Sequence, residues 1–281
     1  MKLIRFGNPG EEKPGIALEG KRFDCSDYFE DWNHDFFRND GLMALQEIIG
    51  KRSLKEVPEE ERWGSPIARP GTILCIGLNY SDHARESGMD LPKEPVLFMK
   101  AANTIGGPFD PVTIPKRSVK TDWEVEMGVV LKRDVLYLED VAEAEKMIAG
   151  YCIVHDISER EFQLNRGGQW VKGKSCPGFS PVGPFLVTRD EIDNVLDLRM
   201  ILKVNQVVKQ SGNTGNMVFN PSYIVWYISQ FMKLEAGDLI STGTPHGVGL
   251  GMKPPQYLMD GDVVELEIEL LGQQKQLFKD Y

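Results

Sequence analysis

Short runs in which apolar and polar residues alternate recur along most of the chain, which is the pattern of strands with one buried face. The clearest run is 263–271, where valine, leucine and isoleucine alternate with glutamate before Gly272 leads into a final hairpin strand. Other apolar or β-branched runs predict strands at 2–6, 15–18, 72–76, 96–99, 151–154, 184–188, 198–204, 207–210 and 238–241. Asn205 and Gln206 are the predicted turn of a hairpin between two of these strands.

Helical spacing is confined to a few segments. It predicts helices at 41–49, at 138–148 with Gly150 as the stop, and after Asn220, which precedes a proline and can cap a helix. The apolar stripe predicted for that last helix is Ile224, Tyr227, Ile228 and Phe231. Many strands and few helices predict a β-rich α+β fold.

The chain divides by pattern into two parts. Residues 1–66 form a predicted small N-terminal module, and prolines 66 and 70 mark the entry to a main domain at 67–281. A chain of 281 residues with 41% hydrophobic and 26% charged residues is typical of a globular protein with a sizeable core.

The net charge of −10 argues against nonspecific binding to nucleic acid or to an anionic membrane surface. The N-terminus lacks an apolar signal core, and no apolar run approaches membrane-spanning length. The four cysteines are far apart and form no C-x-x-C pair, which is typical of reduced thiols. We therefore expect a cytoplasmic protein.

The segment 122–127 carries two glutamates separated by one apolar residue. Read as one strand with a half-buried face, it places Asp122, Glu124 and Glu126 on the same side. Neighbouring carboxylates repel each other, and desolvation adds to the unfavourable free energy. A hard divalent cation would offset both effects. A solvated strand face at a sheet edge would also accommodate these charges, so the local spacing leaves both interpretations open.

Asp156 follows the predicted strand 151–154 and could supply a third oxygen ligand, or could instead cap a helix or turn. His155 beside it is predicted to be a packed strand residue.

Ser81 and Asp82 can cap a short helix that carries His83 and Glu86. Residues three apart are neighbours on a helix, and a carboxylate beside an imidazole raises its basicity, as a general base requires. An exposed pair of little consequence is the alternative.

Arg160 and Gln163 stand at helical spacing, and Arg160 could hold a substrate carboxylate through two N–H groups. Lys172 and Lys174 lie in a glycine-rich segment. Either could stabilise a developing oxyanion near a metal, or be a solvated loop lysine. The loop 242–251 is rich in glycine and threonine and could bind an anion, but it matches neither the P-loop nor the dinucleotide pattern.

Six motifs stand in a fixed order along the main domain. They are CIGLNYSDHARE (75–86), DWEVE (122–126), GYCIVHDISER (150–160), KSCPGFSPVGP (174–184), NTGNMVF (213–219) and GDLISTGTPHGVG (237–249). Together they resemble the fumarylacetoacetate hydrolase family, in its bacterial branch of acylpyruvases and diketo-sugar-acid hydrolases. The resemblance covers roughly residues 70–281.

The resemblance implies a roll of mixed β-sheets similar to a sandwich, a homodimer, and one Mg²⁺ per subunit, with Mn²⁺ or Ca²⁺ as substitutes. It also implies roles for matching residues. The implied metal ligands are Glu124, Glu126 and Asp156; the implied water-activating pair is His83 and Glu86; and the implied substrate contacts are Arg160, Gln163, Lys174 and Thr244.

Three positions depart from the family pattern. Leu78 stands where some acylpyruvases carry arginine, which removes one substrate cation. Pro177 and Gly178 replace a common Asp-Thr pair, and His246 stands where members vary and is assigned no role. The motifs GGQWVKGK (167–174) and GMKPPQY (251–257) carry a finer resemblance to hydrolases of 2,4-diketo-3-deoxy sugar acids, such as those of L-fuconate or L-rhamnonate breakdown.

The implied reaction is cleavage of a C–C bond in a 2,4-diketo acid. Water activated by His83, with Glu86 behind it, would attack the C4 carbonyl, and Lys174 would stabilise the oxyanion. The products would be pyruvate and a second carboxylic acid. A 2-oxo-acid decarboxylase or tautomerase on the same metal site is the alternative, and a non-catalytic module that binds a keto acid is a third interpretation.

Overall fold

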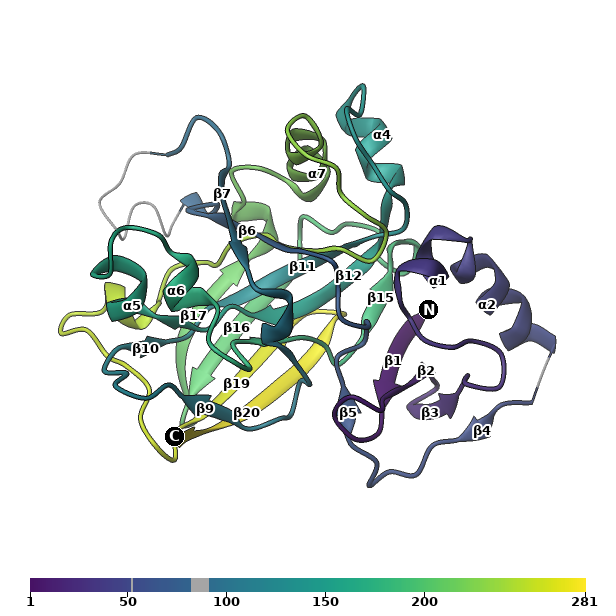
Figure 1. Ribbon diagram of the computed structural model, residues 1–281, viewed down its shortest axis with the longest axis horizontal. Coiled ribbons are helices and arrows are strands. Elements are labelled where there is room, and N and C mark those ends of the chain that lie inside the picture. Colours follow the sequence, from purple (N-terminus) through teal and green to yellow (C-terminus); the bar gives the residue numbers. More distant parts are fainter. Residues whose placement is uncertain (52, 82–90) are drawn as a thin grey trace.

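A large β-sheet runs through the whole molecule in the computed structural model, which describes residues 1–51, 53–81 and 91–281 (Figure 1). Its strands are β1 (Lys2–Phe6), β2 (Lys13–Leu18), β3 (Lys21–Asp24), β4 (Lys55–Glu56), β5 (Trp63–Gly64), β6 (Ile73–Gly77), β7 (Val96–Lys100), β11 (Val125–Leu131), β12 (Ile148–His155), β15 (Leu186–Thr188) and β18 (Leu239–Ser241). Their order across the sheet is β4-β3-β2-β1-β15-β12-β11-β18-β6-β7, and β5 pairs with β1.

A second sheet of five strands is built largely from the C-terminal part of the chain. It contains β9 (Val112–Ile114), β16 (Arg199–Val204), β17 (Val207–Asn213), β19 (Val263–Ile268) and β20 (Gly272–Asp280), in the order β17-β16-β19-β20-β9. The predicted hairpin turn is confirmed, because Asn205 and Gln206 have φ of 49° and 69° between β16 and β17. Positive φ at both residues is the requirement of a tight two-residue hairpin turn.

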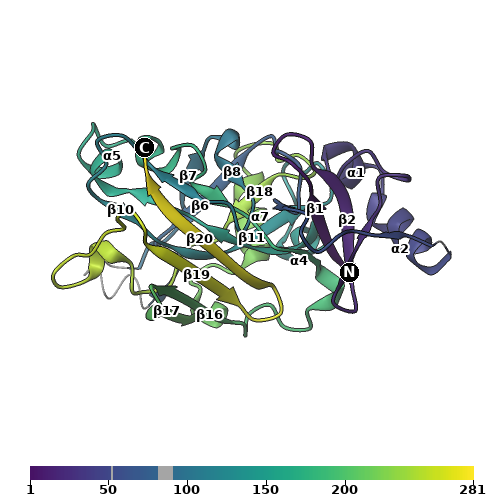
Figure 2. The ribbon, with the colours of Figure 1, turned by 90° about the horizontal axis from the view of Figure 1, so that it is seen from below.

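The main core lies between the two sheets. Figure 2 shows β19 and β20 in front of β11, and apolar side chains of these sheets form one buried cluster. The cluster includes Val125, Met127 and Val129 of β11, Met200 and Leu202 of β16, and Val264 and Leu266 of β19. The predicted β-rich α+β fold is confirmed.

Helices cover the faces and edges of the sheets. They are α1 (His34–Arg38), α2 (Gly41–Lys51), α4 (Val141–Lys146), α5 (Arg160–Leu164), α6 (Val171–Lys174) and α7 (Pro221–Ser229), with short 3-10 turns η1 (Ala102–Thr104), η2 (Arg189–Glu191), η3 (Thr214–Asn216) and η4 (Gly249–Gly251). Paired short strands β10 (Thr121–Asp122) with β13 (Ser158–Glu159), and β8 (Ile105–Gly106) with β14 (Ser180–Pro181), connect the loops. Among the described helices, none is long and apolar enough to cross a membrane.

The N-terminal segment extends the large sheet. β1 pairs antiparallel with β15, so strands from residues 1–64 continue the sheet that holds β11 and β12. A second buried cluster joins α1 and α2 to this part of the sheet through Phe36, Phe37 and Leu45. The boundary at residues 66 and 67 stays a prediction.

Two helix predictions need correction. The helix expected at 138–148 spans only Val141–Lys146, capped by Asp140, and Gly150 lies inside β12 instead of ending a helix. The helix begins only after Asp140, because the carboxylate of this residue caps its first turn. Ile148 and the residues after it pair with β11 and therefore belong to a strand. Asn220 caps α7 as predicted, but Phe231 lies beyond the helix and is 62% exposed, so it is not part of the buried stripe.

The acidic segment is also not the continuous half-buried strand that we predicted. The strand is interrupted at Trp123 and Glu124, and all seven residues of β11 are buried. The carboxylate of Asp122 accepts hydrogen bonds from the N–H groups of Trp123 at 2.8 Å and Gly249 at 2.7 Å. A side chain that binds its own backbone in this way competes with the strand ladder.

Candidate active site

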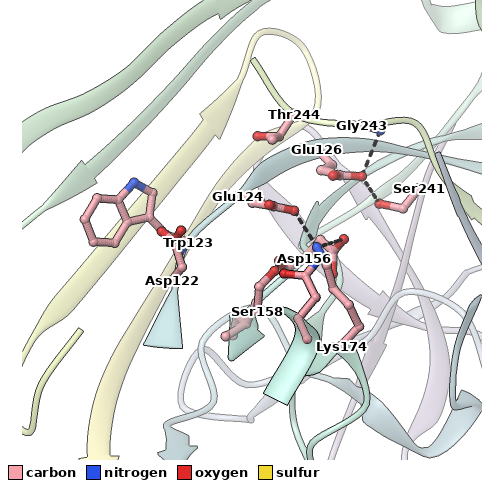
Figure 3. Close-up of polar contacts among 12 residues, drawn as sticks. Asp122, Trp123, Glu124, Glu126, Asp156, Ser158, Lys174, Ser241, Gly243 and Thr244 are labelled. Carbon is pink, nitrogen blue, oxygen red and sulfur yellow. Dashed lines mark hydrogen bonds and ion pairs between the residues drawn. The ribbon is translucent and has the colours of Figure 1, made fainter. Parts of the chain in front are cut away.

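Three carboxylates meet where β11 and β12 lie side by side. Glu124 precedes β11, Glu126 lies within it, and Asp156 directly follows β12. The register pairs Val125 with His155, and the N–H of Asp156 donates to the carbonyl of Glu124 at 3.0 Å. One oxygen of each of the three acids lies within 4.8 Å of the others (Figure 3). Strand pairing therefore assembles the predicted ligand set.

These carboxylates are almost completely buried, with exposures of 5% for Glu124, 2% for Glu126 and 0% for Asp156. Burial, together with the charges of Asp156 and Glu124, raises the pKa of Glu126 to about 8. In the absence of a cation, the three acids therefore do not all carry charge near neutral pH. A divalent cation would remove this repulsion, and an all-oxygen donor set suits a hard ion. The donor set thus fits a divalent metal ion.

Two buried lysines approach the same acids, and their bonding differs. Lys174 Nζ lies 2.6 Å from Glu124 Oε2 and 2.7 Å from Asp156 Oδ2. Lys100 Nζ donates to Asp156 Oδ1 at 2.5 Å and to the carbonyls of Ile157 and Phe179. An ammonium has three N–H groups. Lys100 uses all three within the protein, whereas Lys174 uses two with partners among the described residues, which leaves one for a bound molecule.

The two lysines of the glycine-rich segment, Lys172 and Lys174, differ in burial because of close packing at the residue between them. Lys172 is exposed, and Lys174 is 2% exposed. A side chain at Gly173 would lie 2.4 Å from the carbonyl oxygen of Glu159 and 2.5 Å from the nitrogen of Gln163. Glycine is therefore required where α6 meets α5, and this contact brings Lys174 to the carboxylates.

Arg160 links Glu124 to the neighbouring carboxylate of Asp122. Its Nε lies 2.8 Å from Asp122, its Nη2 lies 2.6 Å from Glu124, and its Nη1 donates to Gln163 at 3.0 Å. Burial opposes the charge, but Asp122 and Glu124 outweigh it and hold the pKa of Arg160 above its usual value. Two of its five N–H groups have no protein partner among the described residues, so it could still hold an anionic group.

Glu126 contacts the loop that follows β18, and Thr244 belongs to that loop. The Ser241 hydroxyl and the Gly243 N–H donate to Glu126 Oε2 at 2.5 Å and 2.9 Å. The Thr244 hydroxyl donates to the carbonyl of Val125 at 2.9 Å and accepts from Gln210 at 2.8 Å. Since its one proton is already used, Thr244 would have to release Val125 before its hydroxyl could donate to a substrate.

A pocket of about 560 Å³ opens onto this cluster. Its polar lining includes a group that we call the polar floor: Glu124, Glu126, Arg160, Gln163, Lys174 and Thr244. These are six of the seven predicted site residues that the structure describes, and the seventh, Asp156, does not line the pocket but accepts a hydrogen bond from Lys174. The other two, His83 and Glu86, lie outside the described residues. The roles assigned to all nine stay predictions.

Some residues of the site carry no local sequence signal. Lys100 ends an apolar strand, and we did not predict it to reach Asp156. Asp122 was expected only to share a strand face; besides Arg160, it binds the N–H groups of Gly249 and Leu250. Both contacts join segments that are far apart in the chain, so spacing could not indicate them. His155 is buried as predicted, with its Nδ1 3.0 Å from Gln276.

Comparison with known proteins shows which family the chain belongs to. The model for the C-terminal domain of fumarylacetoacetate (FAA) hydrolase matches residues 72–278. A protein of Burkholderia multivorans named "Putative hydrolase" is 49% identical over 282 residues, covering 99% of this chain and 98% of that relative.

Solved structures share the fold over the full chain. Fumarylacetoacetate hydrolase from psychrophilic Exiguobacterium antarcticum is 32% identical, with a TM-score of 0.86 and 100% of both chains covered. Maleylpyruvate hydrolase from Sphingobium sp. SYK-6, solved with manganese(II) and pyruvate, is 23% identical, with a TM-score of 0.81 and coverage of 100% of this chain and 99% of that one. This chain therefore belongs to the fumarylacetoacetate hydrolase family.

Proposed function

We propose that this protein is a metal-dependent hydrolase that cleaves a 2,4-diketo acid to pyruvate and a second carboxylic acid. The observation that carries the proposal is the buried triad of Glu124, Glu126 and Asp156 beside Lys174, at the floor of an open pocket. Membership of the fumarylacetoacetate hydrolase family supports it.

The three acids would hold Mg²⁺, with Mn²⁺ or Ca²⁺ as substitutes. When bound, the ion supplies positive charge that stabilises negative charge developing on substrate oxygens. The free N–H groups of Arg160 would hold the carboxylate of the substrate, with Gln163 keeping the guanidinium in place.

In the proposed reaction, water adds to the C4 carbonyl carbon and gives its proton to His83, whose imidazole is oriented by Glu86. The third N–H of Lys174 would donate to the oxygen at C4 as it becomes negative. The C3–C4 bond then breaks, its electron pair goes to C3, and C3 takes up a proton. The fragments are pyruvate and the acid derived from the acyl group.

A panel of 2,4-diketo acids supplied with Mg²⁺ and scored by pyruvate release tests the proposal. Lys174→Met should abolish release, whereas Lys172→Met, which removes an exposed lysine two residues away, should leave it unchanged. No turnover of any diketo acid by the folded, metal-loaded protein would overturn the proposal. Faster release of CO₂ from oxaloacetate would favour the decarboxylase, and binding of keto acids without turnover would favour the non-catalytic module.

A further inference from the structure

The wall of the pocket next to the carboxylates is apolar and partly aromatic. Leu78, Phe98 and Trp170 line it on the side of β6 and β7, and Met252 lines it from the loop after β18. The rings of Phe98 and Trp170 lie with their centroids 5.2 Å apart, at an interplanar angle of 65°. These four side chains are called the apolar wall below.

The position of Trp170 is set by close packing. A side chain on Gly77 would lie 2.9 Å from the Trp170 ring, so glycine is required at the end of β6 for the indole to lie there. Trp170 also directly precedes α6, the helix that carries Lys174. The apolar wall and the polar floor (Glu124, Glu126, Arg160, Gln163, Lys174 and Thr244) are therefore parts of one packed unit.

The apolar wall begins at the polar floor itself. The Lys174 ammonium lies 5.2 Å from the centroid of the Phe98 ring. A substrate whose reacting carbonyl contacts Lys174 would therefore bring its next carbon atoms against Phe98 and Trp170. Among the described residues outside the polar floor, the one charged side chain lining the pocket is Lys253, which is exposed at the rim.

We propose that the acyl half of the substrate is uncharged and presents carbon to the apolar wall, with Trp170 as the specificity-determining residue. A carboxylate at that place would lose hydration without gaining a buried cationic partner from the apolar wall or any other described residue outside the polar floor, which is unfavourable. An exposed lysine at the rim would compensate little, because water already solvates its charge. This inference rests on the proposed function, since it assumes that the diketo acid reacts at the floor.

Two substrates of equal length test the inference. Butanoylpyruvate ends in a methyl group where succinylpyruvate ends in a carboxylate. We expect kcat/KM for butanoylpyruvate to be higher by about tenfold or more, since one misplaced group in a pocket changes selectivity by at least this factor. Equal rates, or a preference for succinylpyruvate that disappears in Lys253→Ala, would overturn the inference while leaving the proposed hydrolysis intact. Failure of both substrates and of acetylpyruvate would instead count against the proposed function.

Substitution of Trp170 is a second test of the inference. Trp170→Ala should lower kcat/KM for butanoylpyruvate by about tenfold, mainly through KM, and should change acetylpyruvate turnover much less because its acyl group is too short to reach the wall. Trp170→Phe should restore most of the loss. Oxalate affinity, which depends on the metal and the floor, should stay constant and would reveal general damage. Equal losses for both substrates with unchanged oxalate affinity would remove Trp170 as the specificity-determining residue.

Discussion

Lys100 and Asp156 form an ion pair in which neither side chain has any exposure to solvent. The lysine comes from the end of β7 and the aspartate from the end of β12, with 55 residues between them in the chain. Because Lys100 also donates to two backbone carbonyls, it has no hydrogen left for a ligand. We interpret it as the residue that positions Asp156.

Lys100→Met should therefore destabilise the protein and weaken metal binding. Removing one partner of a buried pair leaves an uncompensated charge, which lowers the free energy of unfolding by about 3–5 kcal/mol. Denaturant unfolding measures this loss, and Lys172→Met is the matched control, with an expected change within about 0.5 kcal/mol. A Lys100→Met protein with wild-type stability would show that the pair contributes nothing.

Metal removal should abolish activity, and Mg²⁺ or Mn²⁺ should restore it. Glu124→Ala and Glu126→Ala should each weaken metal binding by more than about 100-fold, because they remove ligands rather than their supporting partners. Circular dichroism should show that the fold survives. Full turnover by a preparation shown to be metal-free by elemental analysis would contradict the proposed metal dependence.

Metal affinity should rise with pH up to about 8, the value to which burial, Asp156 and Glu124 raise the pKa of Glu126. Below that pH the carboxyl holds a proton that the cation must displace, so affinity should fall up to about tenfold per pH unit. Titration calorimetry in buffers of different ionisation enthalpy measures the released proton. Glu126→Gln should bind more weakly and release none, and a pH-independent affinity of the wild type would refute this explanation.

The raised pKa of Glu126 also affects the stability of the metal-free protein, which should fall as the pH rises. The folded pKa of Glu126 lies above the usual value of 4.5, so its contribution to stability is present below pH 4.5 and is lost as the pH rises towards 8. We expect the difference in stability between metal-loaded and metal-free protein to increase over this interval. Thermal unfolding at several pH values, with Glu126→Gln as the control, would detect it.

His83→Ala should lower kcat for diketo-acid cleavage by about 10²–10⁴-fold, since it removes activation of water. Glu86→Gln should cause a smaller loss, because an amide can orient the imidazole but does not stabilise its charged form. Oxalate and pyruvate binding should change little in either variant. Undiminished cleavage by His83→Ala would overturn the assignment, and parallel losses of kcat and oxalate affinity would make His83 a structural residue.

The expected homodimer rests on the family resemblance, which implies self-association of the main domain through an apolar surface. Sedimentation at micromolar concentration should give the mass of two chains. A single-chain mass under these conditions would contradict the expectation.

Local patterns in the chain were sufficient to predict many of the elements and to single out three candidate acidic ligands, while the resemblance to the family was needed to favour a metal site over a solvated strand face. Alternation predicted β19, two adjacent turn residues predicted the hairpin at Asn205 and Gln206, and an asparagine before proline predicted the start of α7. Glu124 and Glu126 stand one residue apart, and Asp156 follows a strand. Each of these signals involves residues that are close together in the chain, so local backbone geometry is enough to relate them to a strand, a turn or a helix start.

The other features depended on contacts between distant segments. At the interruption before β11, Asp122 accepts hydrogen bonds both from its neighbour Trp123 and from Gly249, which lies 127 residues further along the chain. The burial of Lys174 rather than Lys172 follows from the close contact of α6 with α5 at Gly173, and the pairing of Lys100 with Asp156 from the position of β7 next to the β12 terminus. No local spacing encodes such pairs, because strand register and packing in the buried core bring them together, and burial then requires each charge to find its partner.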